Sequence, residues 1–328
     1  MILRAVHNSR ISAFAIAFLI LPVFWVRLFL LKTVHITTFN NPCMPLWDNI
    51  IEPIFGYSKY SAAALSMILA FFIAFSINRM ILKFGLMHKQ SMLPFVVYVL
   101  LSSAFLSVQK LNPIWIFTLF FILGIEQLFL GVGKRKPQVN CFNASLLVGI
   151  GVLFYAKGVL LFAVFFMIMA ILRIANHKSI IACLLGLLLP FAIQFCFYFI
   201  TDNTIEFFAR IEENILANLG QYNHGIFSQI YMGIMILLNI ISIILSFKFM
   251  QSQKNLTRRY FRCFTWMMFV ICAAILTPFF SMEIIPVIAL ISTVIISLWL
   301  DNIKRNRIQE IITSILIVLT VLGQIFLI

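Results

Sequence analysis

The chain consists of long apolar runs separated by short polar gaps, and this alternation constrains its fold more than any other feature. A helix needs about 20 apolar residues to cross roughly 30 Å of hydrocarbon. The runs predict about eleven crossings, although the two on either side of Lys157 are short and are also compatible with a re-entrant hairpin. The predicted spans are 11–31, 60–82, 91–109, 113–133, 142–156, 158–172, 179–200, 227–247, 263–281, 284–300 and 309–328.

The composition agrees with this interpretation. Apolar residues make up 63% of the 328 positions and charged residues 10%, whereas soluble domains contain about 45–50% and 25% of these classes. The chain has too little polar surface for a water-soluble fold. We therefore predict an all-α fold, a polytopic transmembrane helix bundle in which residues 1–328 form a single integral membrane domain. The first run lacks a small-residue cleavage pattern after it, so we expect a retained span rather than a signal peptide.

The distribution of charge predicts which side of the membrane each gap faces. With the N-terminus in the cytoplasm, the cytoplasmic gaps contain 17 of the 24 Lys and Arg residues, and the external gaps contain seven of the ten Asp and Glu residues. This asymmetry follows the positive-inside rule. The formal net charge of +14 is spread over these gaps rather than along one basic stripe, so it indicates contact with membrane lipids and not with nucleic acid.

Only two loops are long, at about residues 32–59 and 201–226, and both are predicted to be external. The sequence has no Walker A pattern, no GxGxxG and no repeat of fixed period, which excludes an ATP-driven pump in a single chain. The cysteines and histidines show no CxxC or HExxH spacing, so no metal site is predicted, and no residue pattern identifies a cofactor. Any chemistry must use the outer loops or the interior of the bundle.

Asp48 and Glu52 are the candidate catalytic residues. They stand four apart in the first long loop, so one helical turn would place both carboxylates on one face. Their apolar neighbours suit a segment at the lipid headgroup level, where a carboxylate acts as a base or a ligand on a lipid-linked substrate and Trp47 contacts that substrate. The alternative is an interfacial helix with solvated acids and a tryptophan anchor.

The second long loop predicts an amphipathic helix that ends near Gly220. Apolar residues recur at helical spacing along it, and polar residues follow it before the next span. Such residues either hold a sugar or phosphate or form an ordinary polar loop. The predicted apolar face consists of Ile205, Phe208, Ile211, Ile215 and Leu219. The candidate substrate-binding residues after it are Tyr222, Asn223 and His224.

Glu126 is a further candidate for substrate binding, because it lies inside the predicted span 113–133. A carboxylate at that depth costs several kcal/mol unless it is paired or protonated, so intramembrane acids are candidates for function. The expected partner is Arg79 or Lys83 on another helix. The alternative is an ion pair that only locks helices together.

Two pairs of stretches resemble an uncharacterised multi-spanning family of Bacteroides-type bacteria: SMLPFVVYVLLSSAF with LNPIWIFTLFFILGIEQL, and CFNASLLVGIGVLFY with LLGLLLPFAIQFCFYF. The resemblance implies a bacterial inner-membrane location and no known activity. The layout is also similar to that of the GT-C glycosyltransferases, which place an acid in the first external loop, where Asp48 stands here. The acidic pair of those enzymes is closer together, and a large periplasmic domain is missing from this chain.

Three functions remain open on the sequence alone. The preferred one is a transferase of envelope biogenesis that acts on a polyprenol-linked sugar through Asp48. The second is a transporter or lipid flippase, which would use Glu126 and the proline-broken spans. The third is a non-catalytic scaffold subunit that contacts envelope protein partners. The sequence does not establish that the chain is an enzyme.

Overall fold

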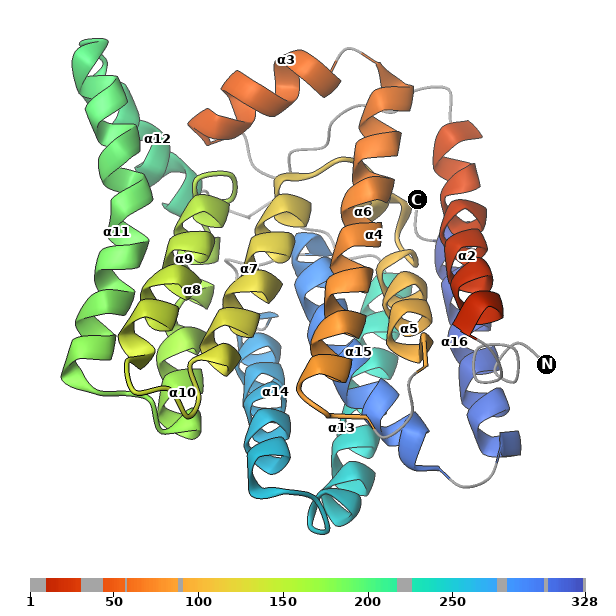
Figure 1. Ribbon diagram of the computed structural model, residues 1–328. Coiled ribbons are helices and arrows are strands. Elements are labelled where there is room, and N and C mark those ends of the chain that lie inside the picture. The colour runs from red at the N-terminus through yellow and green to blue at the C-terminus, as the bar shows by residue number, and fades with distance from the viewer. Residues whose placement is uncertain are drawn as a thin grey trace.

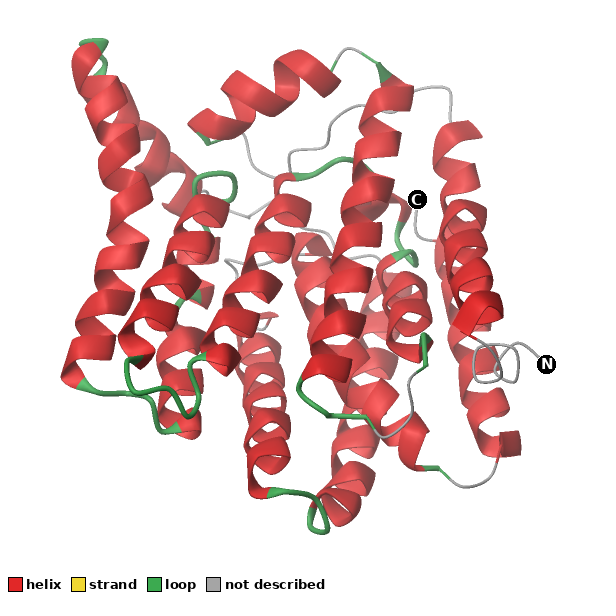
Figure 2. Cartoon of the chain, in the orientation of Figure 1, coloured by secondary structure: helices red, strands yellow, loops and turns green. Residues whose placement is uncertain are grey.

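The computed structural model describes residues 10–30, 44–56, 58–87, 91–216, 226–275, 282–303 and 306–326. Throughout these ranges the secondary structure is helical and no strand occurs (Figures 1 and 2). The long helices stand side by side in one bundle, and short helices cover one of its ends (Figure 1). The predicted all-α class is confirmed.

Within the described residues eleven helices form the bundle, and six further elements connect or cover them. The helices of the bundle are α2 (Arg10–Leu30), α4 (Lys59–Lys83), α5 (Leu93–Ser102), α7 (Pro113–Leu130), α8 (Pro137–Val152), α10 (Ala163–Leu172), α11 (His177–Ile200), α13 (Ile226–Met250), α14 (Asn255–Ile275), α15 (Ile285–Asn302) and α16 (Asn306–Phe326). The connecting and covering elements are η1 (Trp47–Ile51), α3 (Glu52–Phe55), α6 (Leu106–Gln109), α9 (Gly158–Leu161), α12 (Thr204–Leu216) and η2 (Met282–Ile284).

Within the described residues, six helices are long and apolar enough to cross a membrane: α4, α7, α11, α13, α15 and α16. Shorter apolar stretches occur in α2, α5 and α9–α10. The chain is therefore a membrane protein. The finer count of eleven crossings and the cytoplasmic position of the N-terminus stay predictions.

The helix ends gather at two opposite ends of the bundle (Figure 1). The last turns of α4, α7, α10, α13 and α15 lie at one end, which we call the basic end because the described Lys and Arg residues of the predicted cytoplasmic gaps lie in or next to these turns and their loops. The other end carries η1, α3 and α12, and we call it the cap end. α8 rises to the cap end and α9–α10 return to the basic end, so this short pair brings the chain back to the same side, as expected.

α15 lies at the centre of the bundle. Every side chain from 285 to 300 is buried, and α4, α5, α7, α13 and α14 surround the helix. A helix that is apolar on all sides is expected in such a position. Asn239 of α13 donates to Ser292 Oγ at 2.9 Å, a polar link of the kind that holds helices together in lipid. Side chains thus fill the middle of the bundle.

Small residues allow α8 and α11 to pack closely. A Cβ atom added at Gly149 would lie 2.9 Å from the Leu187 carbonyl oxygen, and one added at Gly186 would collide with Ser145. Close backbone approach of this kind drives helix association in lipid, because the hydrophobic effect does not act between helices there. The opposite side of α11 is exposed, for example at Leu188. An exposed apolar surface of this kind is expected where a helix contacts lipid.

The predicted span 91–109 is wrong as a single helix, because α5 and α6 are separate. Backbone carbonyls released at such a break need new partners inside a membrane. Gln109 and Gln324 each donate to the Ser103 carbonyl, at 3.1 and 3.0 Å, and Thr320 donates to a carbonyl in the last turn of α5 at 3.0 Å. Side chains from distant parts of the sequence therefore stabilise the break.

α14 begins well before the predicted span 263–281. Its first turns lie in the basic stretch 248–262, which was expected to be a gap. Tyr260 in this stretch stacks on Phe129 of α7 with ring centroids 4.3 Å apart, so tertiary packing holds the basic segment in helix. The start of α8 at Pro137 is likewise earlier than the predicted 142, since proline favours the first turn of a helix.

Candidate functional site

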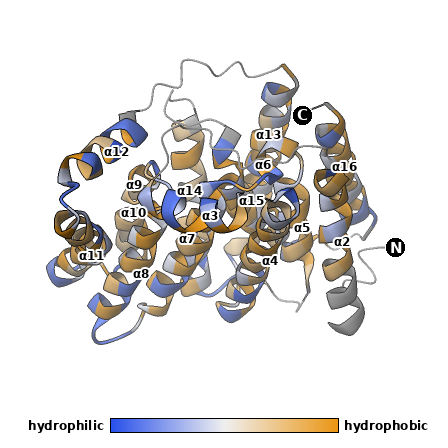
Figure 3. Cartoon of the chain, turned by 90° about the horizontal axis from the view of Figure 1, so that it is seen from above, coloured by the Kyte–Doolittle hydropathy of each residue, from blue (hydrophilic) through white to orange (hydrophobic). Residues whose placement is uncertain are grey.

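Ionisable side chains meet at the cap end, where three segments of the chain pack together. The segments are residues 44–56, the turn 153–157 between α8 and α9, and α12. Met44, Leu153 and Ala156 form a small buried cluster, and Ile211 and Ile215 of α12 pack against it. Figure 3 shows α3 over the middle of the bundle and α12 beside α11. The described parts of the two predicted external loops are thus packed together through buried apolar side chains.

A π-helical turn positions Asp48. In η1 the N–H of Glu52 donates to the Trp47 carbonyl, five residues earlier, and the next residue, Pro53, has no N–H to donate. The proline therefore adds no backbone hydrogen bond to this turn. Trp47 is fully buried in the main core and anchors the turn. Single π turns are frequent at functional sites.

Asp48 forms an ion pair with Arg210 of α12, from which it is separated by 162 positions in the sequence. Arg210 Nη1 lies 2.6 Å from Asp48 Oδ2, and Arg210 Nη2 lies 2.8 Å from Glu206 Oε1. The side chains of Asp48 and Arg210 are 26% and 28% exposed. Burial lowers the pKa of Arg210, but its hydrogen bonds to Asp48 and Glu206 outweigh burial and raise that pKa. The guanidinium stays charged beside a solvent-accessible carboxylate.

α12, the helix that carries Arg210, also carries exposed apolar side chains on its other face. Ile205 and Phe208 of α12 are 85% and 60% exposed, and Ile200 at the end of α11 is 80% exposed. Apolar side chains that are exposed next to charges are typical of the level where lipid tails meet headgroups. A molecule with a polar head on a lipid tail would present its head to the pair at this level.

The predicted amphipathic helix is confirmed as α12, but its residues are not buried strictly according to polarity. Phe207 and Asn214 are buried, whereas Ile205 and Phe208 of the predicted apolar face are largely exposed. The helix is rotated in this way because Phe207 packs against aromatic rings of α11, with centroids 5.5 and 5.8 Å away. The predicted end of the helix at Gly220 lies outside the described residues.

A second charge cluster is buried beneath the cap. Lys157 Nζ lies 3.5 Å from Glu283 Oε1, and the Tyr155 hydroxyl donates to the same oxygen at 2.8 Å. The side chains of Lys157 and Glu283 are only 1% and 2% exposed. Burial raises the pKa of Glu283 and lowers the pKa of Lys157, and the opposite charge of each partner reduces these shifts without cancelling them. Proton transfer within the pair is therefore easier than in water.

On the sequence alone, Lys157 and Glu283 look like ordinary external charges, and their pairing was missed. The sequence did contain one signal for a buried pair, because each of these charged residues stands alone in a long apolar stretch. Lys157 interrupts the apolar region 142–172, and Glu283 is the single acidic residue between 217 and 300. Arg210 was also missed, because the sequence pattern placed it on the polar side of a predicted helix and indicated no partner for it.

The other predicted residues of the cap lie in different settings. Glu52 is exposed, and its carboxylate bonds no other described residue. Trp47 points into the core. The structure thus brings Asp48 to Arg210 and does not bond it to Glu52. Outside the described residues lie Tyr222, Asn223 and His224.

Glu126 lies near the basic end, and both of its carboxylate oxygens are paired. Arg79 Nη2 is 2.5 Å from Oε2, and Lys83 Nζ is 2.8 Å from Oε1. The Glu126 side chain is 6% exposed, whereas those of Arg79 and Lys83 are 52% and 42% exposed, as expected for long cations that reach toward the membrane surface. Both predicted partners are confirmed. The arrangement links α4 to α7.

Fold and site together define an all-helical membrane protein with clustered ionisable groups at its cap end. Across the described ranges, no three His, Cys, Asp or Glu side chains converge in the way a metal ion requires. Comparisons of the chain with known protein families, with curated proteins and with solved structures find no match.

Proposed function

We propose that this protein is a transferase of the bacterial inner membrane that moves a sugar from a polyprenol diphosphate carrier at its outer face, as a step of envelope biogenesis. The observation that carries the proposal is the Asp48–Arg210 pair. A partly exposed carboxylate and guanidinium lie 2.6 Å apart at the cap end, and the same helix α12 carries exposed apolar side chains of the kind found where the polar head of a lipid-linked substrate would be. The filled centre around α15 also favours chemistry at the cap end over passage through the bundle.

Each member of the pair has a role in this reaction. Asp48 accepts the proton of the acceptor hydroxyl while the hydroxyl oxygen attacks the anomeric carbon of the sugar. The bond from that carbon to the phosphate oxygen breaks, and its electron pair leaves with the polyprenol diphosphate. Arg210 binds phosphate oxygens with its fork of N–H donors and stabilises the charge that develops on them. Because phosphate competes with Asp48 for Arg210, substrate binding frees the carboxylate to act as a base.

Isosteric replacement of the base tests this function. In vesicles that contain the purified chain, a polyprenyl-diphosphate sugar and an acceptor, we expect Asp48→Asn to lower sugar transfer by at least about 100-fold. Arg210→Gln is expected to do the same. Glu212→Gln is the matched control, since Glu212 is an exposed acid of the same helix α12. Wild-type transfer by Asp48→Asn, at normal protein abundance, would overturn the proposal.

The buried Lys157–Glu283 pair favours a second candidate function, proton-coupled transport of a lipid-linked molecule. Buried ionisable residues mark proton and substrate pathways in membrane transporters. The double variant Lys157→Met/Glu283→Gln removes both charges and leaves neither unpaired, so we expect it to fold. Loss of pH-driven lipid movement in this variant would favour transport, whereas unchanged sugar transfer would favour the transferase. Glu126 suits transport less, because two cations occupy its oxygens.

A further inference from the structure

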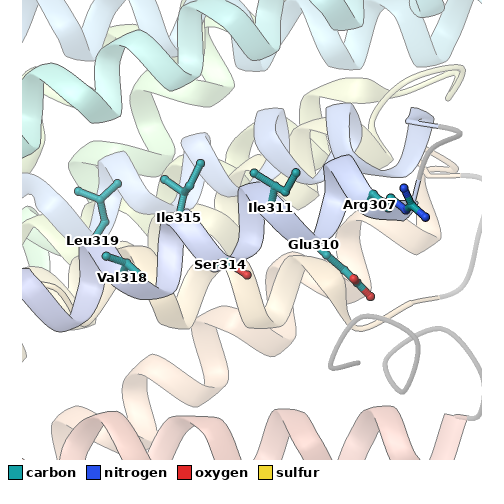
Figure 4. Close-up of a pocket in the computed structure, with 7 residues that line it drawn as sticks. All are labelled: Arg307, Glu310, Ile311, Ser314, Ile315, Val318 and Leu319. Carbon is teal, nitrogen blue, oxygen red and sulfur yellow. The ribbon is translucent and has the colours of Figure 1, made fainter.

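A groove runs along the outer side of α16, away from the cap end. Its volume is about 590 Å³, within the range of ligand sites in proteins. The described residues that line it all belong to α16 (Figure 4). They are Arg307, Glu310, Ile311, Ser314, Ile315, Val318 and Leu319.

The charged residues of the groove lie at one of its ends, and the rest of the lining is apolar except for Ser314. Arg307 and Glu310 lie at the basic end of α16, and the isoleucines and Leu319 follow toward the middle of the bundle (Figure 4). At 1.5 Å per residue, the distance along the helix from Arg307 to Leu319 is about 18 Å. Since the hydrocarbon core is roughly 30 Å thick, the groove has about the depth of one leaflet.

The mouth of the groove offers a cation for a phosphate. Arg307 is exposed, and it forms no ion pair with the described residues. A guanidinium binds phosphate oxygens in a bidentate manner. The described Lys and Arg residues of the predicted cytoplasmic gaps also lie at the basic end, and such residues attract phospholipid headgroups.

The wall below the mouth offers a surface for a hydrocarbon chain. Ile311, Ile315 and Val318 are 57%, 48% and 56% exposed, and they form one stripe at helical spacing. α16 packs on α5 and α13 through its other side, where Leu316 is buried. The stripe therefore faces away from the protein core.

We propose that this groove binds one phospholipid of the leaflet at the basic end. The phosphate lies on Arg307, and one acyl chain lies along Ile311, Ile315 and Leu319. The separation of charge and apolar surface over one leaflet's depth is what selects a phospholipid over a free phosphate or a detached fatty acid. The site is independent of the cap end and of the reaction proposed there.

Retention of lipid by the purified chain tests this site. Native mass spectrometry in mild detergent is expected to find one phospholipid on the wild-type protein after delipidating washes. We expect Arg307→Gln to lower the retained fraction about tenfold, because a charge-assisted hydrogen bond is lost, and Ile315→Trp to abolish retention by filling the groove. Val318→Trp is a second filling variant, in case Ile315→Trp does not fold.

Two controls separate this site from general lipid contact. Arg262→Gln removes an exposed charge near the basic end on α14, and Val321→Trp adds the same bulk to another exposed position of α16. Both are expected to retain the lipid as the wild type does. The proposal is overturned if the wild type retains no phospholipid, or if the controls lose as much as the groove variants. Retention by Arg307→Gln together with loss in Ile315→Trp would also overturn it, by showing a chain-binding groove that does not recognise phosphate.

Discussion

Two buried carboxylates, Glu126 and Glu283, differ in the exposure of the cations that pair with them. Glu126 meets Arg79 and Lys83, whose side chains are about half exposed. Glu283 meets Lys157, which is buried as deeply as the carboxylate itself. An exposed cation can turn to solvent when its partner is removed, whereas a buried ammonium keeps its full desolvation cost. The two acids should therefore respond very differently to neutralisation.

We expect Glu283→Gln to lower the free energy of unfolding by about 3–5 kcal/mol, because the buried Lys157 loses the carboxylate that pairs with it. Glu126→Gln is expected to cost only about 1 kcal/mol, since its partners are solvent-screened. Chemical unfolding in detergent micelles measures both changes. Equal losses in the two variants would contradict the claim that the exposure of the paired cations decides how much stability is lost.

The buried pair also predicts a dependence of stability on pH. Burial raises the pKa of Glu283 above its usual 4.5, and Lys157→Met removes the ammonium that offsets this effect. An acid whose pKa is raised in the folded state stabilises the fold below its unfolded pKa, and this contribution is lost as the pH rises through the folded value.

Lys157→Met should therefore lose stability as the pH rises above about 4.5, as measured by the melting temperature at a series of pH values. The double variant Lys157→Met/Glu283→Gln lacks the titrating carboxyl and should not show this dependence. An identical pH profile in both variants would refute the assignment to Glu283.

At this scale the sequence predicted single residues better than their partners. Asp48 stood out as an acid in a long loop, and Glu126 as an acid in an apolar run with cations on a nearby helix. The Asp48–Arg210 and Lys157–Glu283 pairs join positions more than 120 residues apart, and no local pattern specifies such a distant pairing. Only the packing of the cap brings them together.

Among the elements, those with a strong local signal were well predicted. Long apolar runs such as those of α4 and α11 were found within a few residues, because twenty apolar residues suffice to define a span. The break between α5 and α6 was not found, since its stability comes from Gln109, Thr320 and Gln324 side chains. The early start of α14 depends similarly on Tyr260 packing against α7.

The contact between α8 and α11 gives a prediction at the same scale. Gly186→Ala places a methyl group against Ser145, so we expect a loss of about 1–3 kcal/mol in stability from overpacking. Gly233→Ala on α13 is the matched control, because a Cβ atom there meets nothing within 4 Å. Thermal unfolding of the two variants side by side measures the difference. A loss in Gly233→Ala as large as in Gly186→Ala would show that the close contact is not the cause.

For the whole molecule, charge asymmetry predicted which helix ends lie together. The gaps expected to be cytoplasmic adjoin helix ends at the basic end, and the described parts of both long outer loops lie at the cap end (Figure 1). The proposed chemistry requires in addition that the cap end faces the outside of the cell, because the Asp48–Arg210 pair must meet its lipid-linked substrate there.

The most direct test of this claim is thiol labelling of intact cells with a membrane-impermeant maleimide. Cys43 is first replaced by serine, and a new cysteine is placed at the exposed Glu212 of the cap end or at the exposed Arg135 of the basic end. We predict labelling of Glu212→Cys in intact cells, and labelling of Arg135→Cys only after the membrane is permeabilised. Labelling of Arg135→Cys but not of Glu212→Cys in intact cells would contradict the outward-facing cap and the function proposed for it.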